Sequence, residues 1–339
     1  MLILSGFLLT LPYLRSRVEK SPWPGWKDFY FKRAVRILPS YWASLLIVLV
    51  VYTACGGRYD SPGALLYDLA MHLGFVHNLS YASLVATPLN GVLWTLAVEV
   101  QFYLIFPLLI RGFVKKPLLC YVLMTGAAMA YRLGFVARLE DSTLYVNRLP
   151  AMLDVYANGM LGCWVYVKIA PKCKKYPGAG LLGLMVGVAA LWGIYEILKS
   201  QAAIAPGELR RVGQMQRRYL LSLLGALSLV SLSCSTGWAR RALSSRPVLF
   251  LSGISFNYYI WHQYLAARFV EWGIPPSIYE DPKQAGDLAW QMGYTVLCFG
   301  AALAAAWIMT RFLERPAAEW ARRMRSRAKG TDKKRPARG

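Results

Sequence analysis

The stretch LWTLAVEVQFYLIFPLLI (residues 93–110) is apolar almost throughout and carries one charged residue, Glu99. As a helix, a run of this length crosses the hydrocarbon core of a bilayer. An ionisable side chain inside such a span is costly to bury and is therefore a candidate for function. Glu99 could act as a general base or orient one, or it could pair with an arginine and join two helices.

The whole chain has the composition of a membrane protein. Of its 339 residues, 56% are hydrophobic and 17% are charged, whereas soluble domains contain about 45–50% apolar and about 25% charged residues. We therefore expect an all-α, polytopic transmembrane helical bundle with about eight full spans and an N-terminal half-span. The apolar runs that predict the full spans lie at about 38–54, 91–110, 118–137, 149–168, 178–198, 219–236, 247–270 and 288–311.

The basic residues predict which side of the membrane each loop faces. The net charge is +22, and 28 of the 39 Lys and Arg lie in alternate loops that include the C-terminal tail. The opposite loops hold nine, four of which are arginines within 199–218. Because basic residues collect in cytoplasmic loops, we expect a multi-pass protein of the cell (inner or plasma) membrane with a cytoplasmic C-terminus. The charge therefore predicts contact with membrane lipid and requires no nucleic acid.

The two ends of the chain differ in character. Residues 1–320 are expected to form one membrane domain, and residues 321–339 a basic, disordered cytoplasmic tail. Residues 1–14 are apolar but only half as long as a span, so we expect the sequence to lack the first part of a longer membrane domain. The segment 63–80 is apolar but contains Asp68 and two histidines, which favours an interfacial or re-entrant position over a span.

Cysteine and histidine are sparse and scattered. The six cysteines form no CxxC pair, so neither a disulfide framework nor a zinc site is expected. The three histidines are too far apart in sequence to suggest a metal cluster, and we expect no metal cofactor.

The segment FYFKRAVRILPSYW (residues 29–42) carries two arginines at helical spacing. Arg33 and Arg36 are three residues apart and would share one face of a helix. Two guanidinium groups together suit a phosphate or a pyrophosphate. Spacing alone favours ordinary basic anchoring at the cytoplasmic face over a phosphate site.

Two further segments place polar groups on apolar helices. In LSGISFNYYIWH (residues 251–262), Ser255, Tyr259 and His262 follow one helical face, and histidine is the commonest proton-transfer group. A serine seven residues away is about 10 Å along the axis, too far to be the nucleophile partner of His262. A polar stripe between packed helices explains this pattern as well. Asp154 lies near the end of a predicted span and is expected to reach water.

Taken in order, these motifs resemble the acyltransferase-3 family of polytopic membrane O-acyltransferases, from Leu4 to about Pro316. The matching segments are SGFLL at 5–9, the arginine segment at 29–42, W-[ST]-L-x-x-E-x-x-F-Y-x-x-x-P at 94–107, S-[YF]-x-x-Y-x-x-H at 255–262, and ERP at 314–316.

The resemblance implies transfer of an acyl group, most often acetyl, from acyl-CoA to a hydroxyl of a cell-surface or lipid-linked carbohydrate. By the resemblance, Arg33 and Arg36 would bind phosphates of the donor, and Glu99 and His262 would line the catalytic cavity. The remaining motif residues, expected to contact substrate, are Trp94, Tyr103, Ser255 and Tyr259. The alternatives are a transporter or flippase of acyl groups or polysaccharide precursors, or an inactive scaffold. Transporters often contain two related halves, and the sequence shows no such repeat.

One family motif has no counterpart in this sequence. The first helix of the family carries an arginine followed by a histidine that is regarded as catalytic. We therefore expect the chain as given to be impaired in acyl transfer and a longer form to be active, and the general base stays unassigned. His262 belongs to a different motif and does not replace that histidine.

Overall fold

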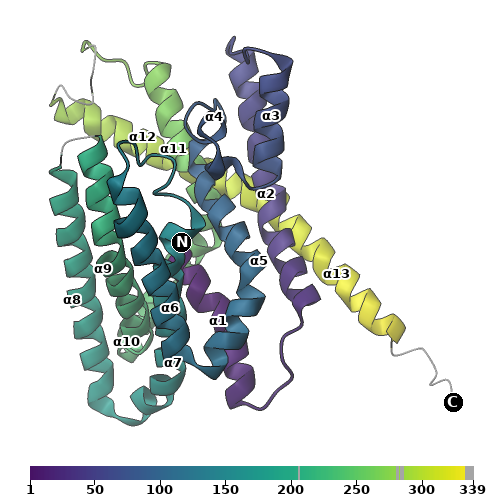
Figure 1. Cartoon of the computed structure of the whole chain (residues 1–339), viewed down its shortest axis with the longest axis vertical. Helices are drawn as coiled ribbons and strands as arrows, with labels where there is room; N and C mark the ends of the chain where they lie inside the picture. Colours follow the sequence, from purple (N-terminus) through teal and green to yellow (C-terminus); the bar gives the residue numbers. More distant parts are fainter. Residues whose placement is uncertain (205–206, 280–281, 283–285, 333–339) are drawn as a thin grey trace. The chain divides into compact units, whose positions relative to one another are not determined.

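The computed structural model describes residues 1–204, 207–279, 282 and 286–332, and these residues are largely helical, with no β-strand among them (Figure 1). The all-α fold class is therefore confirmed. Each predicted span lies on a helix or on a helix with its adjoining turn. The chain divides into two compact units. The first contains Met1–Trp26, Ser61–Ala86 and Trp94–Ser245, and the second contains Lys27–Asp60, Thr87–Leu93 and the described residues from Arg246 onward.

The first unit holds most of the helices. They are α1 (Leu2–Val18), α3 (Pro62–Leu73), α4 (Tyr81–Leu84), α5 (Trp94–Lys115), α6 (Pro117–Met129), α7 (Leu153–Lys175), α8 (Pro177–Ala202), α9 (Glu208–Ser233) and α10 (Gly237–Leu243). The second unit holds α2 (Trp26–Ala54), α11 (Arg246–Glu271), α12 (Leu288–Met309) and α13 (Arg315–Asp332). Two π-helical segments, η3 (Ala130–Phe135) and η6 (Thr310–Glu314), continue α6 and α12.

Length and hydropathy support a multi-pass membrane protein. Within the described residues, five helical stretches are long and apolar enough to cross a bilayer, or six if α9 and α10, bent by 114°, form one broken span. The five are Trp26–Ala54, Gly91–Lys115, Pro117–Arg138, Gly178–Ala202 and Leu288–Ser326. The finer expectation of eight spans and a half-span stays a prediction.

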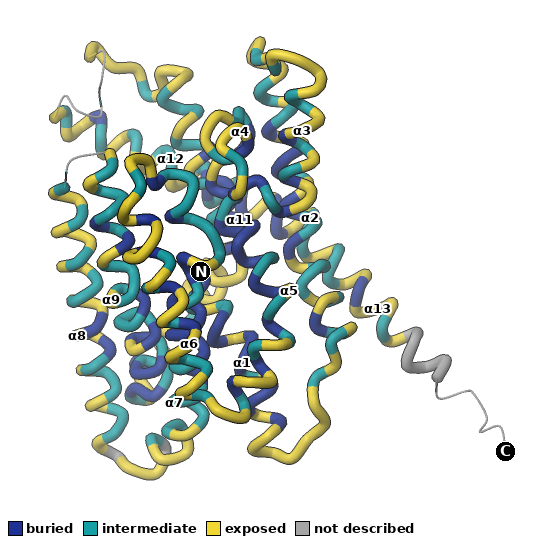
Figure 2. Tube along the Cα trace, in the orientation of Figure 1, coloured by how far each residue is buried: buried dark blue, intermediate teal, exposed yellow. Residues whose placement is uncertain are grey.

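Burial separates the core helix of the first unit from its outer helix (Figure 2). α5 is buried along much of its length, with Leu96, Phe102 and Phe106 fully buried. α8 instead exposes large apolar side chains such as Leu182 and Trp192. An apolar surface of this kind suits contact with lipid acyl chains rather than water.

Glycines allow α1 and α7 to approach closely. A Cβ atom on Gly159 would lie 2.2 Å from the carbonyl oxygen of Ile3, and one on Gly6 would lie 2.5 Å from that of Tyr156. Small residues at such crossings let two backbones pack directly in a membrane. The glycine of the SGFLL motif therefore has a packing role in this chain.

Replacing Gly159 with alanine is expected to destabilise the protein by about 1–3 kcal/mol, because a backbone oxygen occupies the place of the new methyl group. The direction of this change in stability is informative, because alanine normally stabilises a helix relative to glycine by about 1 kcal/mol. Gly126→Ala on α6 is the matched control, because nothing lies within 4 Å of its Cβ position. The thermal unfolding temperature in detergent should fall for Gly159→Ala, and it should stay equal or rise for Gly126→Ala. Equal behaviour of the two variants would contradict the close helix crossing.

The polar segment 63–80 folds inward within the first unit. Its helix α3 has 12 residues, too few to span a bilayer. The imidazole rings of His72 and His77 are buried and stack with centroids 4.1 Å apart. Nδ1 of His72 lies 3.1 Å from Oδ1 of Asp68. Gln101 on α5 donates hydrogen bonds to the carbonyl of Phe75 and to Oδ1 of Asn78, which ties this segment to the core helix.

The C-terminal helix extends past the domain boundary predicted from the sequence. α13 continues to Asp332, past residue 320, where the predicted disordered tail begins. Residues 333–339 of that tail lie outside the described part of the chain. The division into residues 1–320 and 321–339 stays a prediction.

Candidate active site

Glu99 is held inside the first unit by two hydroxyl groups. Its side chain lies on α5 and is 4% exposed. Oε1 accepts hydrogen bonds from Oγ of Ser5 on α1 and, at 2.6 Å, from the phenol of Tyr103, one turn along α5. Among the described residues, the hydrogen-bond partners of Glu99 are hydroxyl groups. They are not an arginine, which was the alternative considered from the sequence. The serine of the SGFLL motif thus meets the glutamate of the second motif.

The second carboxylate oxygen of Glu99 differs from the first in its hydrogen bonding. Within the described part of the chain, Oε2 is buried and has no hydrogen-bond partner. A buried acceptor without a partner is uncommon in folded proteins and calls for an explanation such as a catalytic role. A carboxylate in this position can accept a hydrogen bond or a proton from a substrate hydroxyl.

Tyr156 belongs to the same candidate site, although no sequence pattern distinguishes it. It lies on α7, is fully buried, and stacks on Phe102 with centroids 3.6 Å apart. Its phenol is within electrostatic reach of Glu99 and Tyr103, and its oxygen has no hydrogen-bond partner among the described residues. A tyrosine in an apolar helix resembles ordinary core packing, so only the fold assigns it to the site.

A buried ion pair lies elsewhere in the first unit. Arg132, in the π-helical segment η3, pairs with Asp154 at the start of α7, and both side chains are almost fully buried. The expectation that Asp154 reaches water is therefore wrong. The wider π-helical turn shifts the face that follows it, and Arg132 lies against the carboxylate. One turn along α7, Asn158 accepts from Tyr121 and donates to Ser222.

The arginine segment forms part of α2 in the second unit. Lys32 and Arg36 line a cavity of about 350 Å³, together with Glu314 of the ERP motif. Glu314 accepts a hydrogen bond from the side-chain amide of Asn257 on α11 at 2.9 Å. Arg33 shares α2 with Arg36 but is not among the residues that line this cavity. The structure thus brings one of the two predicted phosphate ligands to a cavity.

The late motif lies on α11, and its members point to different partners. Nδ1 of His262 lies 2.8 Å from the carbonyl oxygen of Tyr259. Because a carbonyl only accepts, Nδ1 carries the proton, and in the neutral ring Nε2 is the basic nitrogen. Ser255 is exposed and donates to the carbonyl of Ser252 at 2.8 Å, which agrees with the expectation that it does not pair with His262.

The predicted residues fall into two groups. Glu99, Tyr103 and the half-buried Trp94 at the start of α5 belong to the first unit. Arg33, Arg36, Ser255, Tyr259 and His262 belong to the second. That these residues line one catalytic cavity stays a prediction.

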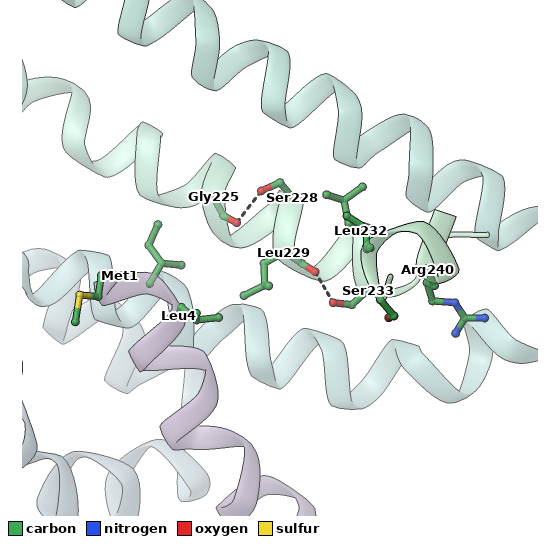
Figure 3. A pocket seen from close by; sticks show the side chains of 11 residues that line it. Met1, Leu4, Gly225, Ser228, Leu229, Leu232, Ser233 and Arg240 are labelled. Atoms are coloured by element: carbon green, nitrogen blue, oxygen red, sulfur yellow. Dashed lines mark hydrogen bonds between the residues drawn. The ribbon is translucent and has the colours of Figure 1, made fainter. Parts of the chain in front are cut away.

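A larger cavity of the first unit, about 630 Å³, does not contain the predicted chemistry (Figure 3). It lies between the start of α1 and helices α9 and α10, and Arg240 lies at its edge. The hydroxyls of Ser228 and Ser233 donate to carbonyls of their own helix, at 2.9 and 2.7 Å. Its lining is mostly apolar and does not include Glu99. We therefore place the candidate site at the buried carboxylate rather than at this cavity.

Fold and site together define a polytopic helical membrane protein with polar groups buried inside its bundle. The profile of the acyltransferase domain (acyltransferase family 3) matches residues 1–311, and the chain belongs to this family of acyltransferases. The resemblance drawn from the ordered motifs is thereby confirmed.

Relatives of the chain include longer proteins. Peptidoglycan O-acetyltransferase OatA of Listeria monocytogenes is 24% identical over 279 residues, which are 77% of this chain and 43% of the relative. Putative O-acetyltransferase SACOL0978 of Staphylococcus aureus is 21% identical over 313 residues, which cover 82% of this chain and 47% of the relative. Nodulation protein 10 of Rhizobium leguminosarum bv. viciae is 29% identical over 122 residues, with 32% and 31% covered. The chain thus spans less than half the length of each relative. No solved structure matches it significantly.

Proposed function

We propose that this protein is a membrane O-acetyltransferase that moves an acetyl group from acetyl-CoA to a hydroxyl of a cell-surface or lipid-linked carbohydrate. The observation that carries the proposal is the family match over residues 1–311, together with relatives named as O-acetyltransferases. One of these is named for peptidoglycan, which supports a carbohydrate polymer as the class of acceptor.

The reaction needs a base near the acceptor and a site for the donor. The acceptor oxygen bonds to the carbonyl carbon of the acetyl group, and the thioester carbon–sulfur bond breaks. The base takes the hydroxyl proton and passes it to the sulfur, so that CoA leaves as a thiol. Glu99 is suited to accept or orient that proton, because Ser5 and Tyr103 hold Oε1 while Oε2 has no hydrogen-bond partner among the described residues. His262 is a second candidate base, with Nε2 available in the neutral ring.

The other predicted residues take binding roles in this proposal. Trp94 and Tyr103 in the first unit, and Ser255 and Tyr259 in the second, contact substrate. Arg33 and Arg36 bind phosphates of CoA from the cytoplasmic side, on which the C-terminus is expected from the charge distribution. The geometry supports Arg36 most directly, because it lines a cavity.

The function is tested with the protein expressed from its complete gene, purified, and supplied with acetyl-CoA and soluble peptidoglycan fragments or lipid-linked sugars. We expect release of CoA thiol that depends on the acceptor, and an O-acetylated product by mass spectrometry. Absence of an acceptor-dependent product across several glycans would contradict the proposal.

Arg36→Gln is expected to raise the KM for acetyl-CoA about 10- to 100-fold and to leave kcat nearly unchanged. The reason is the loss of a charge-assisted hydrogen bond to phosphate, which contributes about 1.5–3 kcal/mol, and each 1.4 kcal/mol is about tenfold in affinity. Lys27→Gln is the matched control, an exposed cation on the same helix outside the cavity. Initial rates over a range of acetyl-CoA concentrations measure both constants. An equal KM in the two variants would refute this role of Arg36.

A further inference from the structure

The cavity beside Arg36 has a second wall that the family motifs do not describe. Its α2 side contributes Lys32 and Arg36, and its other side contributes Arg322 and Arg325 from α13. Both α13 arginines lie beyond residue 311, where the family match ends. The cavity therefore combines a family motif with residues that lie outside the family match.

The α13 wall is one regular helical face. Glu314, Ala318, Arg322 and Arg325 follow one another at intervals of four, four and three residues along η6 and α13, and Ala321 adjoins Arg322. The two alanines leave space beside the cavity, and the arginines provide the charged end of this face. The guanidinium of Arg325 also lies 5.5 Å from the ring centroid of Phe31 on the α2 wall.

Cations outnumber carboxylates around this cavity. Asp28 pairs with Lys32 at 2.6 Å and with Arg325, and Glu314 is held by Asn257. Arg322 donates through Nε to the carbonyl of Ala318 at 3.3 Å, and no described carboxylate pairs with it. Its terminal nitrogens are therefore available to an anion that enters the cavity.

We propose that α13 supplies the second half of the donor site, in which Arg322 and Arg325 bind a phosphate of CoA opposite Arg36. This inference rests on the proposed use of acetyl-CoA as donor. Paired guanidinium groups recognise phosphate through bidentate, charge-assisted hydrogen bonds, and several of them together suit a polyphosphorylated ligand. A cavity of about 350 Å³ has room for a phosphorylated end of such a ligand.

A second basic cavity is the alternative location for the phosphates of CoA. It lies in the first unit, has a volume of about 470 Å³, and is lined by Arg17, Lys20, Arg111 and Lys115. Arg17 is already engaged there, because it donates to the carbonyl of Val114 at 2.6 Å. This cavity contains none of the family's arginine motif.

The test measures CoA binding by calorimetry to the purified full chain in phosphatidylcholine nanodiscs. Arg322→Gln is expected to weaken CoA binding about 10- to 100-fold. Arg323→Gln is the matched control, because this neighbouring exposed cation on α13 does not line the cavity. If the arginines recognise the 3′-phosphate, the Arg322→Gln penalty disappears with 3′-dephospho-CoA; if they recognise the pyrophosphate, the penalty persists. Either pattern supports a phosphate site on α13.

The outcomes separate this inference from the proposed function. If the unmodified protein binds no CoA, the donor assignment itself fails. If Arg36→Gln weakens CoA binding while Arg322→Gln behaves like Arg323→Gln, the donor assignment stands and the α13 site is wrong. The α13 site is equally overturned if only Arg111→Gln weakens binding. It is also overturned if Arg322→Gln leaves CoA affinity intact but lowers retention of phosphatidylglycerol, because the groove then holds a lipid headgroup.

Discussion

Replacing Asp154 with alanine is expected to destabilise the protein by about 3–5 kcal/mol, because the substitution leaves the guanidinium of Arg132 buried without its counter-charge. Arg218 on α9 lies within electrostatic reach of both residues, so removal of the carboxylate also leaves two arginines to repel each other. Unfolding in mixed detergent micelles measures the loss. Asp141→Ala is the control, since this carboxylate is exposed and lies 3.8 Å from Arg211; its removal is expected to leave stability unchanged.

A double variant tests whether the pair acts as a unit. Arg132→Met alone should be destabilising, because it leaves the carboxylate of Asp154 buried and uncompensated. Arg132→Met combined with Asp154→Leu should regain most of that loss, since apolar side chains of similar volume need no counter-charge. If the double variant instead loses the sum of both single effects, the two side chains do not stabilise each other.

The elements that the sequence predicts well are those set by local composition. Apolar runs locate the membrane helices because each run must satisfy its own backbone in lipid. Glu99 is identified as a candidate by its rarity, as one charge in an apolar span. Gly6 and Ser5 are found through a short motif, although only the structure shows that one packs against α7 and the other binds Glu99.

The features that sequence reasoning missed depend on long-range packing. Asp154 is expected to reach water because it lies near the end of a run, yet the π-helical segment η3 places Arg132 against it. Tyr156 carries no pattern that separates it from a core tyrosine. Its place beside Glu99 requires α7 to pack on α1 and α5, which no local rule predicts.

The arginine segment shows both the value and the limit of spacing arguments. Arg33 and Arg36 do lie on one helix, as their spacing predicts. Of the two, only Arg36 lines the cavity of about 350 Å³. Spacing could not predict this, because the opposite wall is formed by η6 and α13, which come hundreds of residues later in the chain. In sequence, Arg322 and Arg325 resemble part of an ordinary basic tail, and the role proposed for them depends on their position in helix α13.

Glu99→Gln is expected to lower kcat for acetyl transfer by about 10²- to 10⁴-fold, the usual contribution of general acid–base catalysis. Glutamine keeps an oxygen that can accept from Ser5 and Tyr103, so the fold should be retained. It cannot take up a proton, and this difference isolates the chemistry from the packing. The KM for acetyl-CoA should change little, because the proposed donor ligands belong to α2 and α13 rather than to α5. Initial rates and thermal unfolding of the same preparation measure both effects.

The opposite pattern would assign Glu99 to helix packing. In that case Glu99→Gln would lower the unfolding temperature while the rate per folded molecule stayed the same. Tyr103→Phe gives an independent test, because it removes one of the two hydroxyls that fix the carboxylate. A positioning role for Tyr103 predicts a loss of about 2- to 12-fold in kcat, which corresponds to the roughly 0.5–1.5 kcal/mol that a typical hydrogen bond contributes. Glu196→Gln on α8 changes an exposed carboxylate and should leave the rate unaltered, so a comparable loss there would show that the effect of Glu99→Gln is not specific to the buried site.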